Sequence, residues 1–399
     1  MSVRTVAVVD VKAFARLAGV EAAIRGTTLS VFPLVMYRTW GSAAVVSQIY
    51  FVIGLVSLMT ALTVPALSRR MPRQRIFSMA IWLYIVSCIF GIVGGKWSTL
   101  AVLCAVMAAA TSFVCFNAYV LDYIDKTEFS KLESLRLFYS AWGWVLGPVL
   151  GVWLLSVWPG APFVLVGCIA VLMLRMKGQM RLGNGKTVVT QQPRAAHPVA
   201  NVRRFFAQPR LVTGWLIPAI RSCGWWFYFV YVGIFAVENG LGDKVGGVAS
   251  SVANMFLLLA PLMLQWLRRH SVRTAVRTGC LFSGLCFVLA SVVSPLPWAT
   301  VLVLAAGTCG LVLLDVCAGL PFMMSVKPSE RTEMSSVYSS FRDASGIISP
   351  ALAWLVLQFF PMAAVFAAAG LGLLAAWMIA ARLHPQLGVP GHLRVRDAK

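Results

Sequence analysis

Residues 98–122 read STLAVLCAVMAAATSFVCFNAYVLD, and no charged side chain occurs before Asp122. At 1.5 Å per residue, an α-helix of this length is about 37 Å long. The hydrocarbon core of a bilayer is about 30 Å thick, so the stretch is typical of a transmembrane helix.

Comparable apolar stretches recur along the whole chain. We predict twelve spans, at 13–36, 43–65, 76–95, 98–122, 137–158, 161–175, 211–237, 247–267, 278–294, 298–325, 337–359 and 362–381. The 399 residues are 59% hydrophobic and only 12% charged, whereas a soluble domain carries about 25% charged residues. A soluble enzyme, a disordered protein and a fibrous protein are therefore excluded, and the sequence predicts an all-α polytopic membrane protein.

The stretch 176–210 divides the predicted spans into two sets of six. It is polar and contains Gly183-Asn184-Gly185 and Gln191-Gln192-Pro193, which are typical of a mobile linker. We therefore expect an N-terminal bundle at 1–175, a cytoplasmic linker at 176–210 and a C-terminal bundle at 211–399 that ends in a short cytoplasmic tail.

The net charge of +21 comes from 34 basic and 13 acidic residues. With a cytoplasmic N-terminus, 28 basic residues fall in cytoplasmic segments and only Arg38, Lys96 and Lys244 fall on the outer side of the membrane. The other three, Arg16, Arg25 and Arg221, lie within spans. This bias predicts an inner (plasma) membrane protein with both termini in the cytoplasm. The charge then needs no nucleic-acid partner, and the basic face suits anionic lipids.

Three short matches in the same order suggest a duplication. Ala23-Ile24-Arg25-Gly26 corresponds to Ala219-Ile220-Arg221-Ser222, Arg69-Arg70 to Arg268-Arg269, and Pro148 to Pro350. The offsets grow slowly from 196 to 202 residues, as small loop insertions would produce. We expect two pseudo-symmetric six-helix halves.

In span count, linker, topology and repeat, the chain resembles the major facilitator superfamily of secondary transporters. The loop from Pro65 to Ile76 is similar to the basic loop between helices 2 and 3 of that family. Arg70 and Arg73 match the family pattern, which implies a gating role for them, while Arg69 stands where the family has Asp.

Residues 143–151 of span 5 are similar to the family's glycine-rich antiporter motif, which implies a gating role for Gly147 and Pro148. Glycines at i, i+4 and i+8 make a flat face on which another helix can pack, and Pro148 adds a kink. Ordinary small-residue packing is the alternative. The motif favours export, but span 4 lacks the Arg of proton-coupled drug exporters and offers Asn117 and Asp122 instead, so no direction is predicted.

Few charges occur in mid-span, where each costs about 2.5–3.5 kcal/mol on insertion scales. Glu21 and Arg25 lie in span 1, Arg221 in span 7 and Asp315 in span 10. The resemblance implies that helices 1, 4, 7 and 10 line a central cavity. Arg25 and Arg221 then form either a clamp for a carboxylate or phosphate or internal pairs with Glu21 and Asp315. The clamp and the internal pairs are compatible if the substrate competes with Glu21 and Asp315 for the arginines.

Glu21 and Asp315 are the predicted proton carriers, with Asp122 as a third candidate, because a change of Arg partner changes the proton affinity of a carboxylate. Thr28 and Phe32 lie beside Arg25, and Trp225 and Tyr228 lie on the face of Arg221. With Asn117 and the two arginines, these residues are the predicted substrate contacts, which implies a solute with an apolar part. Packing or lipid exposure is the alternative for the aromatic side chains.

At the inner end of span 11, Arg342 and Asp343 are predicted to form a cytoplasmic gate with the loop that contains Lys327, Glu330, Arg331 and Glu333. A solvated charge cluster is the alternative. No motif for a metal, a cofactor or a nucleotide is present in the sequence.

We therefore predict a monomeric secondary transporter that moves a small organic solute by alternating access and is coupled to protons. A multidrug or metabolite exporter is one alternative, and a membrane assembly factor or sensor that transports nothing is another. A membrane enzyme is not indicated.

Overall fold

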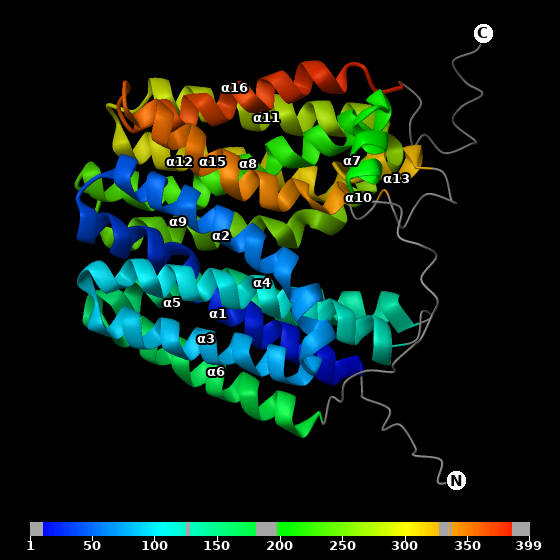
Figure 1. The fold of residues 1–399 in the computed structure, drawn as a ribbon. Helices are drawn as coiled ribbons and strands as arrows, with labels where there is room; N and C mark the ends of the chain where they lie inside the picture. The colour runs from blue at the N-terminus through cyan, green and yellow to red at the C-terminus, as the bar shows by residue number, and fades with distance from the viewer. Residues whose placement is uncertain (1–10, 125–127, 181–197, 327–333, 335–336, 385–399) are drawn as a thin grey trace. The chain divides into compact units, whose positions relative to one another are not determined.

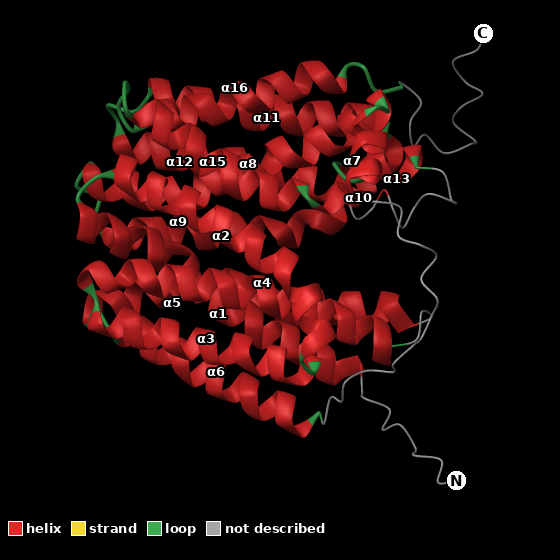
Figure 2. Cartoon of the chain, in the orientation of Figure 1, coloured by secondary structure: helices red, strands yellow, loops and turns green. Residues whose placement is uncertain are grey.

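A computed structural model describes residues 11–124, 128–180, 198–326, 334 and 337–384. Every regular element in these ranges is helical (Figure 2). The chain divides into two compact units, one of Met1–Gly41 and Val52–Val189 and one of Ser42–Phe51 and Thr190–Lys399 (Figure 1). Helix α2 (Ala43–Arg70) therefore contributes its first turns to the second unit and the rest to the first.

The first unit is built around α1 (Val11–Trp40), which packs against three of its neighbours. These are α4 (Ser98–Tyr123), α5 (Phe129–Val157) and α6 (Ala161–Gln179). Helix α3 (Arg73–Val93) packs against α4 and α6, and the 3-10 turn η1 (Gly95–Trp97) leads into α4. The turn is possible because Gly94 and Gly95 adopt positive φ angles.

The second unit is built around α8 (Pro209–Glu238), which contacts α7 (Pro198–Phe206) and five further helices. The five are α9 (Asp243–Met255), α12 (Pro297–Cys317), α13 (Leu320–Ser325), α15 (Phe341–Leu357) and α16 (Ala363–Ala380). The unit also contains η3 (Phe256–Leu259), α10 (Ala260–Arg269) and α11 (Val272–Val292).

The twelve predicted spans are confirmed by the described helices. Ten segments are long and apolar enough to cross a membrane. The other two are α1, which carries Glu21 and Arg25, and α15, which is 17 residues long. The eighth span consists of α9, η3 and α10, and the tenth of α12 and α13. Large apolar side chains such as Leu137 and Leu302 remain more than half exposed, as a protein surrounded by lipid requires.

Several predicted bounds differ from those of the helices; the largest shift is at the fifth span, which begins at Phe129 rather than 137. The sixth runs to Gln179 rather than 175, because Lys177 is accommodated inside the helix pair: its Nζ donates to the carbonyl of Gln74 at 3.0 Å and to Ser78 Oγ at 2.5 Å. The ninth starts at Val272 rather than 278, because Ser271 caps the helix by accepting a hydrogen bond from the backbone N–H of Thr274.

Part of the predicted linker over 176–210 is helical, because α7 forms over 198–206 and α6 extends to Gln179; its mobility stays a prediction. Phe205 is fully buried in a cluster with Phe322 and Met334, and Tyr338 packs against the same cluster. Arg203 and Arg204 remain on the exposed face. The amphipathic pattern of this short helix explains its docking. Residues 181–197 lie outside the described part of the chain.

Candidate functional site

The second unit places an ion pair within its transmembrane helices. Arg221 of α8 donates from Nη1 to Asp315 of α12, and Trp225, one turn after Arg221, donates from Nε1 to the other carboxylate oxygen at 3.1 Å. The Asp315 side chain is 29% exposed and that of Arg221 is 16% exposed. The carboxylate is thus held on both oxygens while it stays within reach of solvent.

The remaining donors of Arg221 are used unequally. Its Nη2 donates to Ser222 Oγ at 3.0 Å, whereas its Nε is buried and has no hydrogen-bond partner in the described residues. Its Cζ lies 5.7 Å from the centre of the Phe341 ring, and Arg342 lies 5.8 Å from the same ring. Two cations therefore share one aromatic side chain.

The first unit contains a similar but looser arrangement. Arg25 and Glu21 of α1 are 3.9 Å apart, at the limit of an ion pair, and the Arg25 side chain is 44% exposed. The buried Tyr84 of α3 donates its hydroxyl to Glu21 Oε1 at 3.3 Å. The guanidinium of Arg25 lies 5.2 Å from the centre of the Trp144 ring on α5. Both internal pairs considered from the sequence are thus present.

Three other residues predicted to contact the substrate are packed or hydrogen-bonded within their own unit. The Thr28 hydroxyl donates to the carbonyl of Ile24 at 3.0 Å, and Phe32 is buried against α6. Tyr228 is fully buried and donates to the carbonyl of Ala249 at 2.8 Å. Asn117 of α4 is partly exposed. Contact of these four residues with a substrate stays a prediction.

The residues predicted for gating near the loop after α2 are placed differently. Arg73, at the start of α3, forms an ion pair with Asp122, at the end of α4, and its guanidinium lies 5.6 Å from the Tyr119 ring. Arg70 is exposed. The pair therefore joins a predicted gating residue to a predicted proton carrier, and both roles stay predictions.

The glycine face of α5 packs directly on α1. A Cβ atom on Gly147 would lie 2.5 Å from the carbonyl carbon of Gly26, and one on Gly26 would lie 2.0 Å from the carbonyl oxygen of Gly143. Pro148 is buried next to this contact. The two backbones can approach this closely only because these positions carry no side chain.

The predicted cytoplasmic gate of span 11 is only partly described. Arg342 is exposed and Asp343 is partly buried in the first turn of α15. Their proposed partners Lys327, Glu330, Arg331 and Glu333 lie outside the described residues.

Sequence reasoning missed Tyr84, Trp144 and the contact of Phe341 with Arg221. The signal for Tyr84 was available, because it is the one phenol in the apolar stretch 76–95. The position of Trp144 gave no signal, because its role depends on the packing of α5 against α1. Within the described ranges, no cluster of His, Cys, Asp and Glu could hold a metal ion.

Comparison with known proteins gives three results. The family described as Major Facilitator Superfamily matches residues 17–350. The structure is similar to that of the nucleoside transporter NupG, with a TM-score of 0.73 and 12% identity over 94% of this chain and 100% of that chain. It is also similar to a POT family transporter in complex with 5-aminolevulinic acid, with a TM-score of 0.71 and 12% identity over 92% and 94% of the two chains. No curated protein matches the sequence.

Proposed function

Because this chain belongs to the major facilitator superfamily, we propose that it carries a small organic anion with an apolar part, in exchange with or together with protons. Its family makes it a multi-pass secondary transporter of a small molecule rather than an enzyme. The proposal adds the class of substrate, the coupling ion, an inner-membrane location with both termini in the cytoplasm, and a monomeric state. Alternating access of two halves is the mechanism we assign to it.

The observation that carries the proposal is the Arg221–Asp315–Trp225 arrangement. A guanidinium kept at this depth is costly unless it is paired or functional. Asp315 pairs with it, yet the buried Nε still lacks a partner in the described part of the chain. A carboxylate or phosphate can bind two guanidinium nitrogens side by side. An anionic substrate that displaces Asp315 would satisfy Arg221 more completely than Asp315 does.

Arg25 supports the same chemistry in the first unit. Its contact with Glu21 is long, and nearly half of its side chain is exposed, so it retains donors for an anion. Trp144 beside Arg25 and Trp225 beside Arg221 supply apolar surface next to each cation. This combination favours a substrate with both a negative charge and an apolar body.

Proton coupling follows from the same two carboxylates. When an anion takes the arginine, the carboxylate loses its positive partner and its proton affinity rises. Asp315 and Glu21 would therefore take up a proton as the substrate binds and release it when the ion pair forms again. The glycine face of α5 packs on α1, which accounts for the antiporter-like motif by packing and gives no preference for export.

The test is transport by the purified protein in vesicles that contain a pH-sensitive dye, with a panel of aromatic carboxylates and phosphate esters and their neutral analogues. We expect internal pH to change only with anionic compounds. Arg25→Ala and Arg221→Ala should each abolish this response, whereas Arg382→Ala, which removes an exposed arginine after α16, should preserve it.

Two results would contradict the proposal. Unchanged affinity in both arginine variants would leave Arg25 and Arg221 with structural ion pairs only. A pH response to neutral compounds alone would remove the anionic substrate. A comparison of everted with right-side-out vesicles gives the direction of transport.

A further inference from the structure

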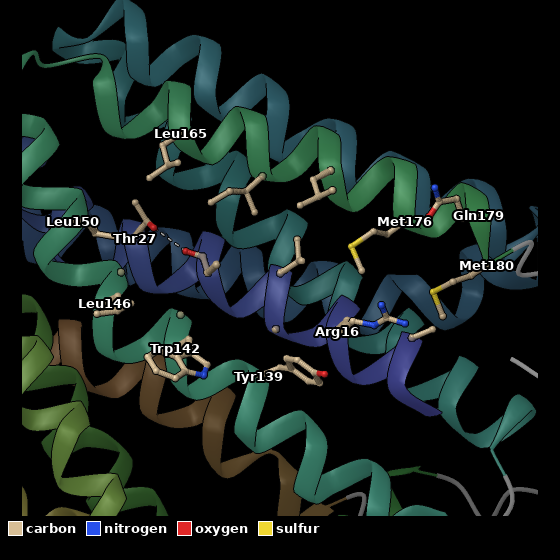
Figure 3. Close-up of a pocket in the computed structure, with 18 residues that line it drawn as sticks. Arg16, Thr27, Tyr139, Trp142, Leu146, Leu150, Leu165, Met176, Gln179 and Met180 are labelled. Atoms are coloured by element: carbon tan, nitrogen blue, oxygen red, sulfur yellow. Dashed lines mark hydrogen bonds between the residues drawn. The ribbon is translucent and has the colours of Figure 1, made fainter. Parts of the chain in front are cut away.

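A groove with a volume of about 900 Å³ runs along the first unit between α1, α5 and α6 (Figure 3). In Figure 3, α1 lies between the other two helices. It lines the groove with small side chains such as Ala23, while α5 contributes Leu146 and Leu150 and α6 contributes Leu165 and Leu172. The groove is thus mostly apolar, with small residues along its middle helix.

The groove exists because α1 and α5 pack backbone to backbone. Gly19, Gly26 and Gly143 remove the side chains that would otherwise separate the two helices. The same small residues leave the adjoining face of α1 without bulk, so the space toward α6 is not filled. Leu146 is 47% exposed and Leu172 is 48% exposed, so the walls are open to the surroundings of the protein.

One end of the groove is basic and the other is apolar. Figure 3 shows Arg16 beside Met180 at one end, and Thr27 with Leu150 at the other. Arg16 donates only its Nε, to the carbonyl of Lys12 at 3.3 Å, and the rest of its guanidinium has no partner in the described residues. The Thr27 hydroxyl already donates to the carbonyl of Ala23 at 2.8 Å, so it offers a ligand no free donor.

The length of the groove matches one leaflet of a bilayer. Arg16 and Thr27 are eleven residues apart on α1, or about 16 Å along the helix. Half of the hydrocarbon core is about 15 Å thick. A lipid chain that starts at Arg16 would therefore reach the middle of the membrane at Thr27.

We propose that this groove binds one anionic phospholipid of the cytoplasmic leaflet, with its phosphate at Arg16 and an acyl chain between α5 and α6. The basic end is the end that the distribution of Lys and Arg assigns to the cytoplasm, so the head group and the guanidinium lie at the same level. The inference rests on the proposed orientation of the chain and is independent of its transport substrate.

The experiment uses the full-length protein in detergent with phosphatidylglycerol or phosphatidylcholine of identical acyl chains, and native mass spectrometry measures the lipid that remains bound. We expect one phosphatidylglycerol to bind in preference to phosphatidylcholine. Arg16→Ala should weaken phosphatidylglycerol about fivefold and leave phosphatidylcholine unchanged. Arg75→Ala removes an equal charge outside the groove and should change neither. Leu165→Trp fills the apolar end and should weaken both lipids.

The inference is overturned if Arg16→Ala binds phosphatidylglycerol as the unmodified protein does, or if Arg75→Ala reduces binding equally. It is also overturned if Leu165→Trp binds both lipids normally. A dimer that is seen by light scattering and that Leu165→Trp dissociates would overturn it too, because a second copy of the chain would then cover the groove. Should Leu165→Trp fail to fold, Leu150→Trp makes the same test from α5. Lipid retention needs no transport, so its failure is distinguishable from failure of the proposed function.

Discussion

Asp315 neutralises Arg221 and accepts a hydrogen bond from Trp225. Asp315→Asn keeps the shape but leaves the mostly buried guanidinium without its counter-charge. We expect the free energy of unfolding to fall by about 1–3 kcal/mol, seen as a lower melting temperature in detergent.

The double variant Arg221→Gln/Asp315→Asn separates charge from shape. It removes both charges together, so it should recover most of the lost melting temperature while substrate-driven proton movement stays absent. Equal melting temperatures for the single and double variants would show that the unpaired charge of Arg221 is not what destabilises Asp315→Asn.

At the scale of the elements, the position of α5 depends on its close packing against α1. Gly147→Ala places a Cβ atom 2.5 Å from the backbone of Gly26 and must push the two helices apart, at about 1–3 kcal/mol of stability. Gly178→Ala is the matched control, since a Cβ atom there meets nothing within 4 Å. Its melting temperature should be unchanged or slightly higher. If both variants melt alike, the close approach of α1 and α5 is not what holds the first unit together.

Helix α7 offers a second test at this scale. Phe205→Ala removes a fully buried ring from the cluster around Phe322, which typically costs about 3–5 kcal/mol. We expect faster backbone hydrogen exchange over 198–206. Phe206→Ala, at a position that is 44% exposed, should have a smaller effect. A similar increase in both variants would mean that α7 is not anchored through Phe205.

At the scale of the whole molecule, the charge distribution predicts its orientation. Lys244 is the one basic residue between α8 and the apolar stretch that begins at 247. The chain after α16, in contrast, contains Arg382, Arg394, Arg396 and Lys399. Alkaline phosphatase, which is active only outside the cytoplasm, should therefore be active when fused after Leu241 and inactive when fused after Arg382. The reverse pattern would invert the topology and, with it, the assignment of the lipid groove.

The spans could be predicted from the sequence, because membrane insertion depends on a local run of about 20 apolar residues. The sequence also identified the mid-span charges, since each is conspicuous in such a run, and the pairs Glu21–Arg25 and Arg221–Asp315 as alternatives to a clamp. Four contacts are visible only in the folded protein: Trp225 binds Asp315 together with Arg221, Tyr84 binds Glu21, Asp122 pairs with Arg73, and Phe205 packs in the cluster around Phe322. These contacts join residues far apart in the chain, and they depend on which helix faces meet, which no local pattern contains.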